Sequence, residues 1–241
     1  MSSELLILIS VTLIASGVGT ATGFGTSTIM VPVLSLFYPL PVTLLFVGII
    51  HLFGDLWKVI LFKKAVNWRL VLSFGIPGII ASYAGAAISL DVSPVLLKRF
   101  LGGFLLIYVV FLFAKQNWEL PKSNKLAAVG GSLSGLFAGV FGVGGAIRGA
   151  FLTAFNLPKE VYIFTSGFIA LFIDSTRIFK YVTGGIMLQQ SLLYAMLGCI
   201  PISFLGAWLA KKFLTKVPQV SFRLLIAVFL GLVALKFLIW S

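Results

Sequence analysis

The chain has 241 residues, of which 60% are hydrophobic and only 10% charged, whereas a soluble globular domain carries about a quarter charged residues. Together with a mean hydropathy of +1.13, this composition excludes an ordinary soluble domain and favours a set of membrane spans of about 20 apolar residues each. The net charge is +12, but most basic residues sit in short connections between apolar runs, which excludes a nucleic-acid-binding face and favours a role in membrane topology.

Eight apolar segments follow one another along the chain, and we expect each to be helical. They run from about Leu5 to Tyr38, Val42 to Phe62, Leu70 to Leu90, Leu101 to Ala114, Leu126 to Phe155, Val161 to Val182, Ser191 to Ala210 and Phe222 to Trp240. The polar segment Lys115–Lys125 separates the first four from the last four. The stretch Met1–Ser10 lacks the basic region of a secretory signal, so we expect it to belong to the first membrane segment. The predicted fold class is an all-α integral membrane protein.

The first segment is too long for one ordinary span. It covers 34 residues, and the run GVGTATGFGTST interrupts it midway. Because each glycine disfavours a helix interior by about 1 kcal/mol, the glycines of this run predict a break and two half-helices. These glycines are Gly17, Gly19, Gly23 and Gly25.

This break is the first candidate substrate site. Its three hydroxyl residues open an apolar stretch, as N-cap residues open a helix. A helix start presents unpaired N–H groups and a partial positive charge, which bind anions. Irregular backbone inside a membrane survives only where protein or a cavity satisfies it. The candidate substrate-binding residues here are Gly23, Phe24, Gly25, Thr26, Ser27 and Thr28.

The second segment carries three ionisable residues, His51, Asp55 and Lys58. Spacings of four and three residues place them on one helix face. Ionisable groups within a span cost several kcal/mol unless they are paired or hydrated, so they are functional candidates. His51 is the only histidine of the chain, and it is interpreted either as the carrier of a coupling proton or as a hydrogen-bonded packing residue.

A matched break, GVFGVGGAIRGAF from Gly139 to Phe151, interrupts the fifth segment. It supplies a second helix start, and we expect the two starts to face each other at mid-membrane. The alternative is that the glycines only let helices approach closely; the hydroxyl cluster of the first break and the arginine of the second favour a substrate site. The candidate substrate-binding residues here are Gly142, Val143, Gly144, Gly145 and Arg148.

The sixth segment repeats the charge pattern of the second. Each aspartate is followed three positions later by a basic residue, which leaves Arg148 as a surplus positive charge suited to an anionic substrate. Two alternatives stay open: the basic residues snorkel to the interface, or the pairs lie toward opposite membrane faces and act as gates. The residues assigned to coupling or gating are His51, Asp55, Lys58, Asp174, Arg177 and Tyr181.

The second and sixth segments belong to a wider internal repeat. Five residues of the first half have counterparts displaced by 119 positions: Gly23, Gly25, Gly48, Asp55 and Lys58 correspond to Gly142, Gly144, Gly167, Asp174 and Arg177. Later correspondences are displaced by 124, as in Pro77 with Pro201. Such repeats are the usual construction of secondary transporters. We expect a first repeat over residues 1–118 and a second over 119–241, within one compact transmembrane domain.

The distribution of basic residues bears on the orientation of the two repeats. If the first and fifth segments are hairpins that return to the side on which they begin, each repeat crosses three times and the halves are inverted. The basic residues outside Arg148 then divide twelve to five between the two sides, whereas eight simple spans divide them ten to seven. Because positive residues favour the cytoplasm, the sharper asymmetry favours inverted repeats with re-entrant hairpins and both termini outside.

At the glycine breaks and the repeated Asp–basic pair, the sequence resembles the TauE/SafE family of sulfite exporters and organosulfonate permeases. The resemblance covers essentially the whole chain and rests on the paired motifs GFGTSTIMVP and GVFGVGGAIRGAFL. It implies transport of sulfite, sulfonates or related sulfur-containing organic acids across the bacterial inner membrane, coupled to an ion gradient. Phe151 stands where relatives have a proline like Pro32, and Arg148 replaces a small residue, so the resemblance does not fix the exact substrate.

The resulting hypothesis is a secondary transporter that moves a small anion by alternating access. The alternative is an anion channel, because half-helix starts and an arginine also line channels. We expect no enzyme, no cofactor and no metal, since one histidine, one cysteine and six acids form no familiar metal site or nucleophile–base pair. The expected partners are the anion, the lipid bilayer and protons or sodium as the coupling ion, with no nucleic acid; association into a homo-oligomer is left open.

Overall fold

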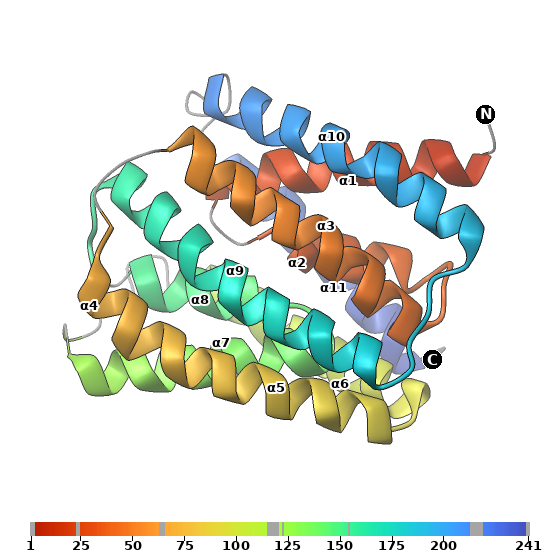
Figure 1. Ribbon diagram of the computed structural model, residues 1–241, viewed down its shortest axis with the longest axis horizontal. Coiled ribbons are helices and arrows are strands. Elements are labelled where there is room, and N and C mark those ends of the chain that lie inside the picture. The colour runs from red at the N-terminus through yellow and green to blue at the C-terminus, as the bar shows by residue number, and fades with distance from the viewer. Residues whose placement is uncertain are drawn as a thin grey trace.

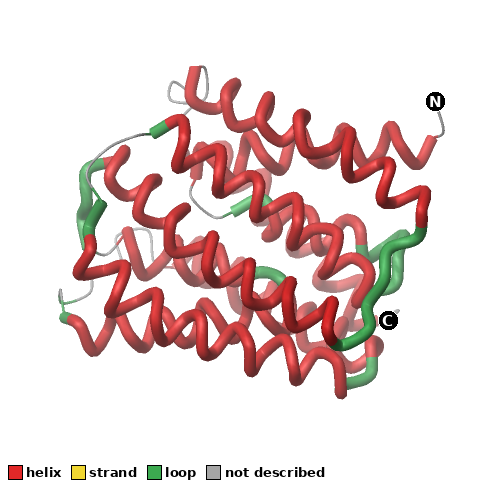
Figure 2. The backbone as a smooth tube through the Cα atoms, viewed as in Figure 1, coloured by secondary structure: helices red, strands yellow, loops and turns green. Residues whose placement is uncertain are grey.

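The computed structural model describes residues 3–22, 25–62, 66–114, 121, 123–153, 155–212 and 219–239. All regular structure within these ranges is helical (Figure 2), which confirms the predicted all-α class. The elements are α1 (Ser3–Thr22), α2 (Ser27–Leu34), α3 (Leu40–Leu61), α4 (Trp68–Leu70), the π-helical turn η1 (Val71–Gly75), α5 (Ile76–Asp91), α6 (Pro94–Ala114), α7 (Asn124–Phe141), α8 (Gly144–Thr153), α9 (Lys159–Thr183), α10 (Gln190–Lys212) and α11 (Gln219–Ile239).

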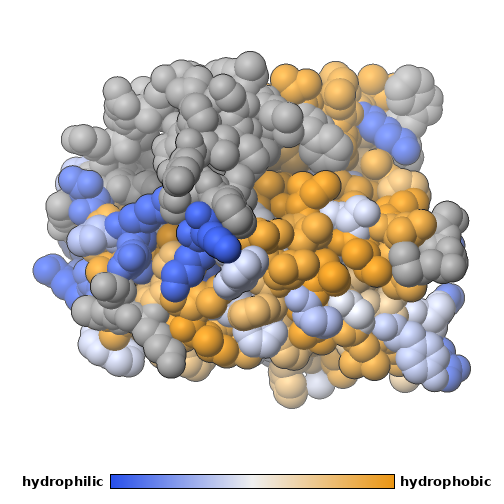
Figure 3. All heavy atoms as spheres, turned by 90° about the horizontal axis from the view of Figure 1, so that it is seen from above, coloured by the Kyte–Doolittle hydropathy of each residue, from blue (hydrophilic) through white to orange (hydrophobic). Residues whose placement is uncertain are grey.

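The lengths and the surface of these helices suit a membrane. Six stretches within the described ranges are long and apolar enough to span one: Glu4–Ala21, Leu40–Leu61, Trp68–Asp91, Pro94–Phe111, Lys159–Thr183 and Gln190–Lys212. Large apolar side chains point outward from them, as at Ile80, Ile107 and Leu197, which are 67%, 71% and 64% exposed. Apolar residues cover much of the face seen in Figure 3, and hydrophilic ones gather toward one end of it. These features indicate a multi-pass membrane protein.

Each predicted apolar segment contains a helix or a broken pair of helices. The largest difference in bounds is at α6, which begins at Pro94 rather than near Leu101. Proline fits the first turn of a helix, where its missing N–H is not needed, and the helix then carries Lys98 and Arg99 in its early turns. The predicted segments leave Lys98 and Arg99 in the connection before Leu101. Because that prediction used only the run of apolar residues, it placed the start of the helix too late.

The break in the first segment is narrower than expected. Gly17 and Gly19 lie inside α1, which is a 20-residue helix rather than a half-helix, while α2 has only eight residues. A Cβ at position 19 would lie 2.5 Å from the backbone nitrogen of Thr26. Gly19 therefore permits the close approach of α2 to α1, and the prediction that it helps to end the helix is wrong.

A π-helical turn precedes α5 in the segment predicted as one regular helix. Pro77 lies in the first turn of α5, and it has no N–H with which to close the preceding α-helical turn. The backbone widens there into η1, over Val71–Gly75, as helices do where the regular hydrogen-bond ladder is interrupted.

Helix pairs from the two halves of the chain pack against each other. α3 packs against α9, α6 against α11, α1 against α10 and α5 against α7. The short helices α2 and α8 lie among these pairs (Figure 1), and most of α2 is buried. The larger apolar core joins Met30 and Val31 of α2 to Leu44 of α3 and Val143 of the second break. This packing puts both breaks beside the middle of α3 and α9.

Each broken segment returns to the end of the molecule at which it begins, and the two segments use opposite ends. In Figure 1 the first turn of α1 and the connection from α2 to α3 both lie toward the right-hand end. The first turn of α7 and the connection from α8 to α9 both lie toward the left-hand end. Each pair, α1 with α2 and α7 with α8, therefore forms a hairpin, and the two hairpins point in opposite directions.

Candidate functional site

The two helix breaks meet in the centre of the bundle. α2 begins at Ser27, two residues after Gly25, which adopts φ = +80°, a left-handed conformation that favours glycine. α8 begins at Gly144 after the second break. A Cβ on Gly25 would lie 3.5 Å from the Cα of Gly145, so the backbones of the two breaks are in contact.

The first break presents buried hydroxyl groups without hydrogen-bond partners among the described residues. Thr26 and Ser27 are both 0% exposed, and their Oγ atoms make no hydrogen bond there. Thr26 occupies the N-cap position of α2 as predicted, but its side chain does not cap the helix. Because buried polar groups are normally paired, these hydroxyls and the uncapped helix start are available to a polar ligand.

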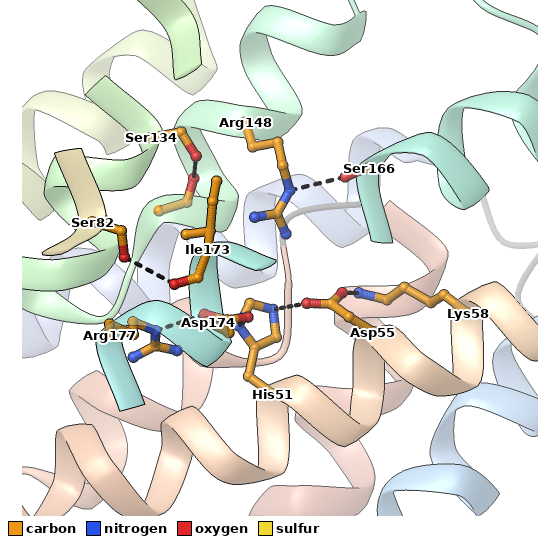
Figure 4. A network of polar contacts seen from close by, with 11 residues as sticks. His51, Asp55, Lys58, Ser82, Ser134, Arg148, Ser166, Ile173, Asp174 and Arg177 are labelled. Atoms are coloured by element: carbon orange, nitrogen blue, oxygen red, sulfur yellow. Dashed lines mark hydrogen bonds and ion pairs between the residues drawn. The ribbon is translucent and has the colours of Figure 1, made fainter. Parts of the chain in front are cut away.

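α3 and α9 place five ionisable side chains in one line (Figure 4). Lys58 Nζ lies 2.7 Å from Asp55 Oδ1, and Asp55 Oδ2 lies 3.4 Å from His51 Nε2. On the other side of the imidazole, His51 Nδ1 lies 3.0 Å from Asp174 Oδ2, and Asp174 Oδ1 lies 2.6 Å from Arg177 Nε. None of the five residues is more than 3% exposed. We call these five residues the ionic line.

The ionic line joins the two charge pairs that the sequence treated separately. The two pairs meet rather than lie far apart, because both carboxylates reach the same imidazole; their role as gates stays a prediction. Only the basic ends point away from each other (Figure 4). Lys58 and Arg177 are buried inside the protein, which does not favour the snorkelling alternative. A buried pair is stable only when both charges remain paired, so the line is a single electrostatic unit.

Arg148 brings a further positive charge to this centre. It lies on α8 and is 1% exposed, and its Nε donates a hydrogen bond of 3.0 Å to Ser166 Oγ on α9. Its Nη2 has no hydrogen-bond partner among the described residues. The guanidinium points toward the ionic line (Figure 4), but no described carboxylate lies within ion-pair distance of it. The ionic line is neutral when His51 is neutral, so Arg148 is the uncompensated charge of the centre.

Tyr181 supports the centre from the end of α9. It is 0% exposed, and its hydroxyl donates a hydrogen bond to the carbonyl oxygen of Gly139. This bond ties α9 to α7 just before the second break, beside the guanidinium of Arg177. Tyr181 thus contacts the backbone of the break and the guanidinium of Arg177 rather than either carboxylate.

The remaining predicted site residues lie in or around the breaks, with two exceptions. Gly23 and Phe24 are outside the described residues. Thr28 and Val143 are buried, and Gly142 adopts φ = +72° as the C-cap of α7. The backbone carbonyl of Gly144 accepts a hydrogen bond from Ser134 Oγ at 2.9 Å.

The sequence analysis missed Ser166, the partner of Arg148. It precedes Asp174 by eight residues on α9, a little over two helical turns, so it lies near the same helix face. The spacing of Ser166 from Asp174 could have indicated that it belongs to the site. Serine is common in membrane helices, however, so this spacing alone does not identify a partner of Arg148.

His51, Asp55 and Asp174 are a described group of potential metal ligands, with one ligand atom from each lying within 4.8 Å of the others. The group suits a metal ion poorly, however. Each carboxylate already has a cationic nitrogen 2.6 or 2.7 Å away, from Arg177 or Lys58. A metal ion would be repelled by these two cations, so we assign no metal site here.

Gly25 gives a direct test of this geometry. A Cβ at this position would lie 2.6 Å from His51 Nε2, and the left-handed backbone costs any other L-residue about 1–2 kcal/mol. Gly25→Ala is therefore expected to lower the apparent melting temperature of the purified protein in detergent. The matched control is Gly103→Ala on α6, where an added Cβ meets nothing within 4 Å. A Gly25→Ala protein as stable as this control would contradict the contact between the break and the imidazole.

Comparison with known proteins gives a family match over nearly the whole chain. A family model described as "Sulfite exporter TauE/SafE" matches residues 8–237. No curated protein and no solved structure matches the chain.

Proposed function

The chain belongs to the TauE/SafE sulfite exporter family, and on that premise we propose that it is a secondary transporter for a small sulfur-containing anion. The proposed substrates are sulfite, a sulfonate or a related organic acid, carried across the bacterial inner membrane. We further propose a binding site for this anion, a transport cycle and coupling to an ion gradient.

The observation that carries the proposal is the buried, uncompensated charge of Arg148. An isolated cation in a membrane interior is costly, and this one keeps a terminal nitrogen without a described partner. The oxygens of a sulfite or sulfonate group match the planar donor fork of a guanidinium. The hydroxyls of Thr26 and Ser27 and the starts of α2 and α8 supply further donors and favourable dipoles for the same anion. The site therefore has the chemistry of an oxyanion receptor.

The helix pairing supports a transport cycle built on two repeats. Exchanging residues 1–118 with 119–241 turns the α1–α10 contact into α7–α5 and returns α3–α9 and α6–α11 to themselves. This is the pattern expected of two repeats related by a two-fold axis. The hairpins α1–α2 and α7–α8, which point in opposite directions (Figure 1), are proposed as the re-entrant segments of inverted repeats.

The closed state of the site favours alternating access over a permanent pore. The ionic line and Arg148 are no more than 3% exposed, so substrate reaches them only after the helices around the breaks move. A transporter that rocks one part against another exposes such a site to each side in turn. The movement is proposed to be coupled to a gradient of protons or sodium.

The experiment that tests this function measures tracer flux in proteoliposomes. Sulfite, sulfate, thiosulfate, small sulfonates and carboxylates are compared, each with and without a proton or sodium gradient. Saturable, gradient-driven flux of a sulfur-containing anion is the expected result. Flux that rises linearly with concentration and ignores both gradients would identify a channel. No flux of any anion, from protein that remains monodisperse after reconstitution, would refute the proposed function.

A further inference from the structure

His51 is in an unusual position for a histidine, because both of its ring nitrogens face carboxylates. Nδ1 lies 3.0 Å from an oxygen of Asp174 on α9, and Nε2 lies 3.4 Å from an oxygen of Asp55 on α3. The residue is 2% exposed, so water cannot replace either contact at little cost. The imidazole is thus the bridge between a carboxylate of each half of the chain (Figure 4).

The charge of the His51 imidazole depends on whether one or both of its ring nitrogens carry a proton. A neutral imidazole has one N–H donor and one lone pair, whereas an imidazolium has two donors. An ionised carboxylate offers only acceptor lone pairs. Neither ring nitrogen makes an aligned hydrogen bond with a described residue, so the two contacts are ion-pair contacts. Two carboxylates at these distances favour the charged imidazolium, which carries a second proton, over the neutral ring.

The neighbouring cations decide where the second proton resides. Lys58 Nζ and Arg177 Nε lie 2.7 and 2.6 Å from the far oxygens of Asp55 and Asp174. A cation at this distance favours the ionised form of a carboxylate. Both carboxylates are therefore anions, and the imidazole is the group that accepts the proton.

We propose that His51 is a proton-binding site of this protein, occupied in the present conformation, and that its proton is the ion coupled to anion transport. The inference rests on the proposed function and deepens it by naming the coupling ion and the group that carries it. Protonation raises the formal charge of the centre, formed by the ionic line and Arg148, from +1 to +2. An additional positive charge beside the oxyanion receptor strengthens anion binding.

Within the part of the chain that the structure describes, the surroundings of His51 offer no other group for this role. The charged groups facing it are Asp55 and Lys58 from α3, Asp174 and Arg177 from α9, and Arg148 from α8. Among the described residues of the first break, Gly25 lies beside it, since a Cβ there would be 2.6 Å from His51 Nε2. Sodium would need several oxygen ligands free of other cations, and both carboxylates already have cationic partners. A proton needs only the second ring nitrogen.

Proton binding and anion binding are thermodynamically linked, so each can be measured through its effect on the other. If protonation of His51 strengthens anion binding, anion binding must favour protonation by the same factor. Wild-type protein should bind methanesulfonate about tenfold more tightly at pH 6 than at pH 8, a typical coupling between two sites. Methanesulfonate is used because it does not itself titrate in this range. In weakly buffered solution at pH 8, where the empty protein is less protonated than at pH 6, its binding should also take up protons, followed with a pH-indicator dye.

The matched variant is His51→Gln, which keeps two polar ends but does not titrate. We expect it to bind and exchange methanesulfonate with affinity independent of pH, to take up no protons on binding, and to lose accumulation driven by a proton gradient. Unchanged proton uptake in this variant would overturn the assignment to His51. Accumulation by wild-type protein under a sodium gradient alone would overturn proton coupling. Wild-type protein that transports no anion would refute the proposed function instead.

A second measurement needs no variant. His51 is the only histidine of the chain, so protein purified by a histidine-free tag and labelled with [15N]histidine gives one imidazole in the NMR spectrum. We expect both ring nitrogens to be protonated with methanesulfonate bound at pH 7. A neutral imidazole from pH 5 to pH 8, unchanged by methanesulfonate, would overturn the inference even if His51→Gln does not fold.

Discussion

Arg148→Ala is expected to weaken binding of the transported anion by about 2–5 kcal/mol, the usual loss when one partner of a buried hydrogen-bonded charge pair is removed. This corresponds to an increase in Kd of about 30-fold or more. The physical reason is that Arg148 is the cation of the centre without a described acidic partner. Its removal takes away both the charge and the donors that an oxyanion would use. The measurement is equilibrium binding of radiolabelled substrate to purified protein.

Two further variants separate charge from structure in that experiment. Arg148→Lys keeps the charge but loses the planar fork, so an intermediate affinity is expected. Arg99→Ala removes an arginine exposed on α6, and a surface substitution of this kind should change the affinity by no more than about twofold. Undiminished binding or uptake by Arg148→Ala would remove Arg148 from the substrate site.

Asp174→Asn is expected to destabilise the folded protein by about 3–5 kcal/mol, because breaking a buried pair leaves an uncompensated charge. Asp174 contacts Arg177 Nε at 2.6 Å and His51 Nδ1 at 3.0 Å, so the substitution removes the negative charge and sets an NH2 donor against one of these two partners. The chain carries its own reporter of unfolding, since its one cysteine, Cys199, is 0% exposed. A thiol-reactive fluorophore should label it at a lower temperature in the variant than in the wild type.

The double variant Asp174→Asn with Arg177→Gln tests whether charge imbalance is the cause. Removing both charges of the pair should restore much of the lost stability, as replacement of whole buried pairs often does. Asp91→Asn, at an exposed position at the end of α5, serves as the control and should shift stability by no more than about 0.5 kcal/mol. If the double variant is less stable than Asp174→Asn alone, the ionic line is held together by something other than charge balance.

Much of the fold was predictable because a bilayer leaves few choices to an apolar chain. Runs such as Val42–Phe62 must be helical to satisfy their own backbone, and α3 covers Leu40–Leu61. The errors arose where a residue acts through tertiary contact. Gly19 was predicted to help break the first segment, but it lies within α1 and makes room for the backbone of Thr26. Composition alone does not distinguish a glycine that ends a helix from one that admits a neighbour.

The site was predictable in its parts but not in its assembly. Spacing along one helix identified the pair of Asp55 with Lys58 and that of Asp174 with Arg177, because residues three apart share a face. The meeting of both pairs at His51 depends on how α3 packs against α9, and no spacing within one segment encodes that. The second half has alanine at the position matching His51, so the internal repeat gave no indication that one imidazole would serve both carboxylates.

The uncompensated charge of Arg148 also determines how the centre responds to the membrane potential. The two ion pairs each sum to zero, so the empty centre with a neutral imidazole carries a formal charge of +1. Moving one elementary charge through the field changes the free energy by about 2.3 kcal/mol per 100 mV. A monovalent anion neutralises the unprotonated centre, and a dianion neutralises the centre protonated at His51. In the proposed transport cycle, a centre neutralised in this way would reorient without electrical work, whereas a protonated centre holding a monovalent anion would keep a charge of +1 and its movement would depend on the voltage.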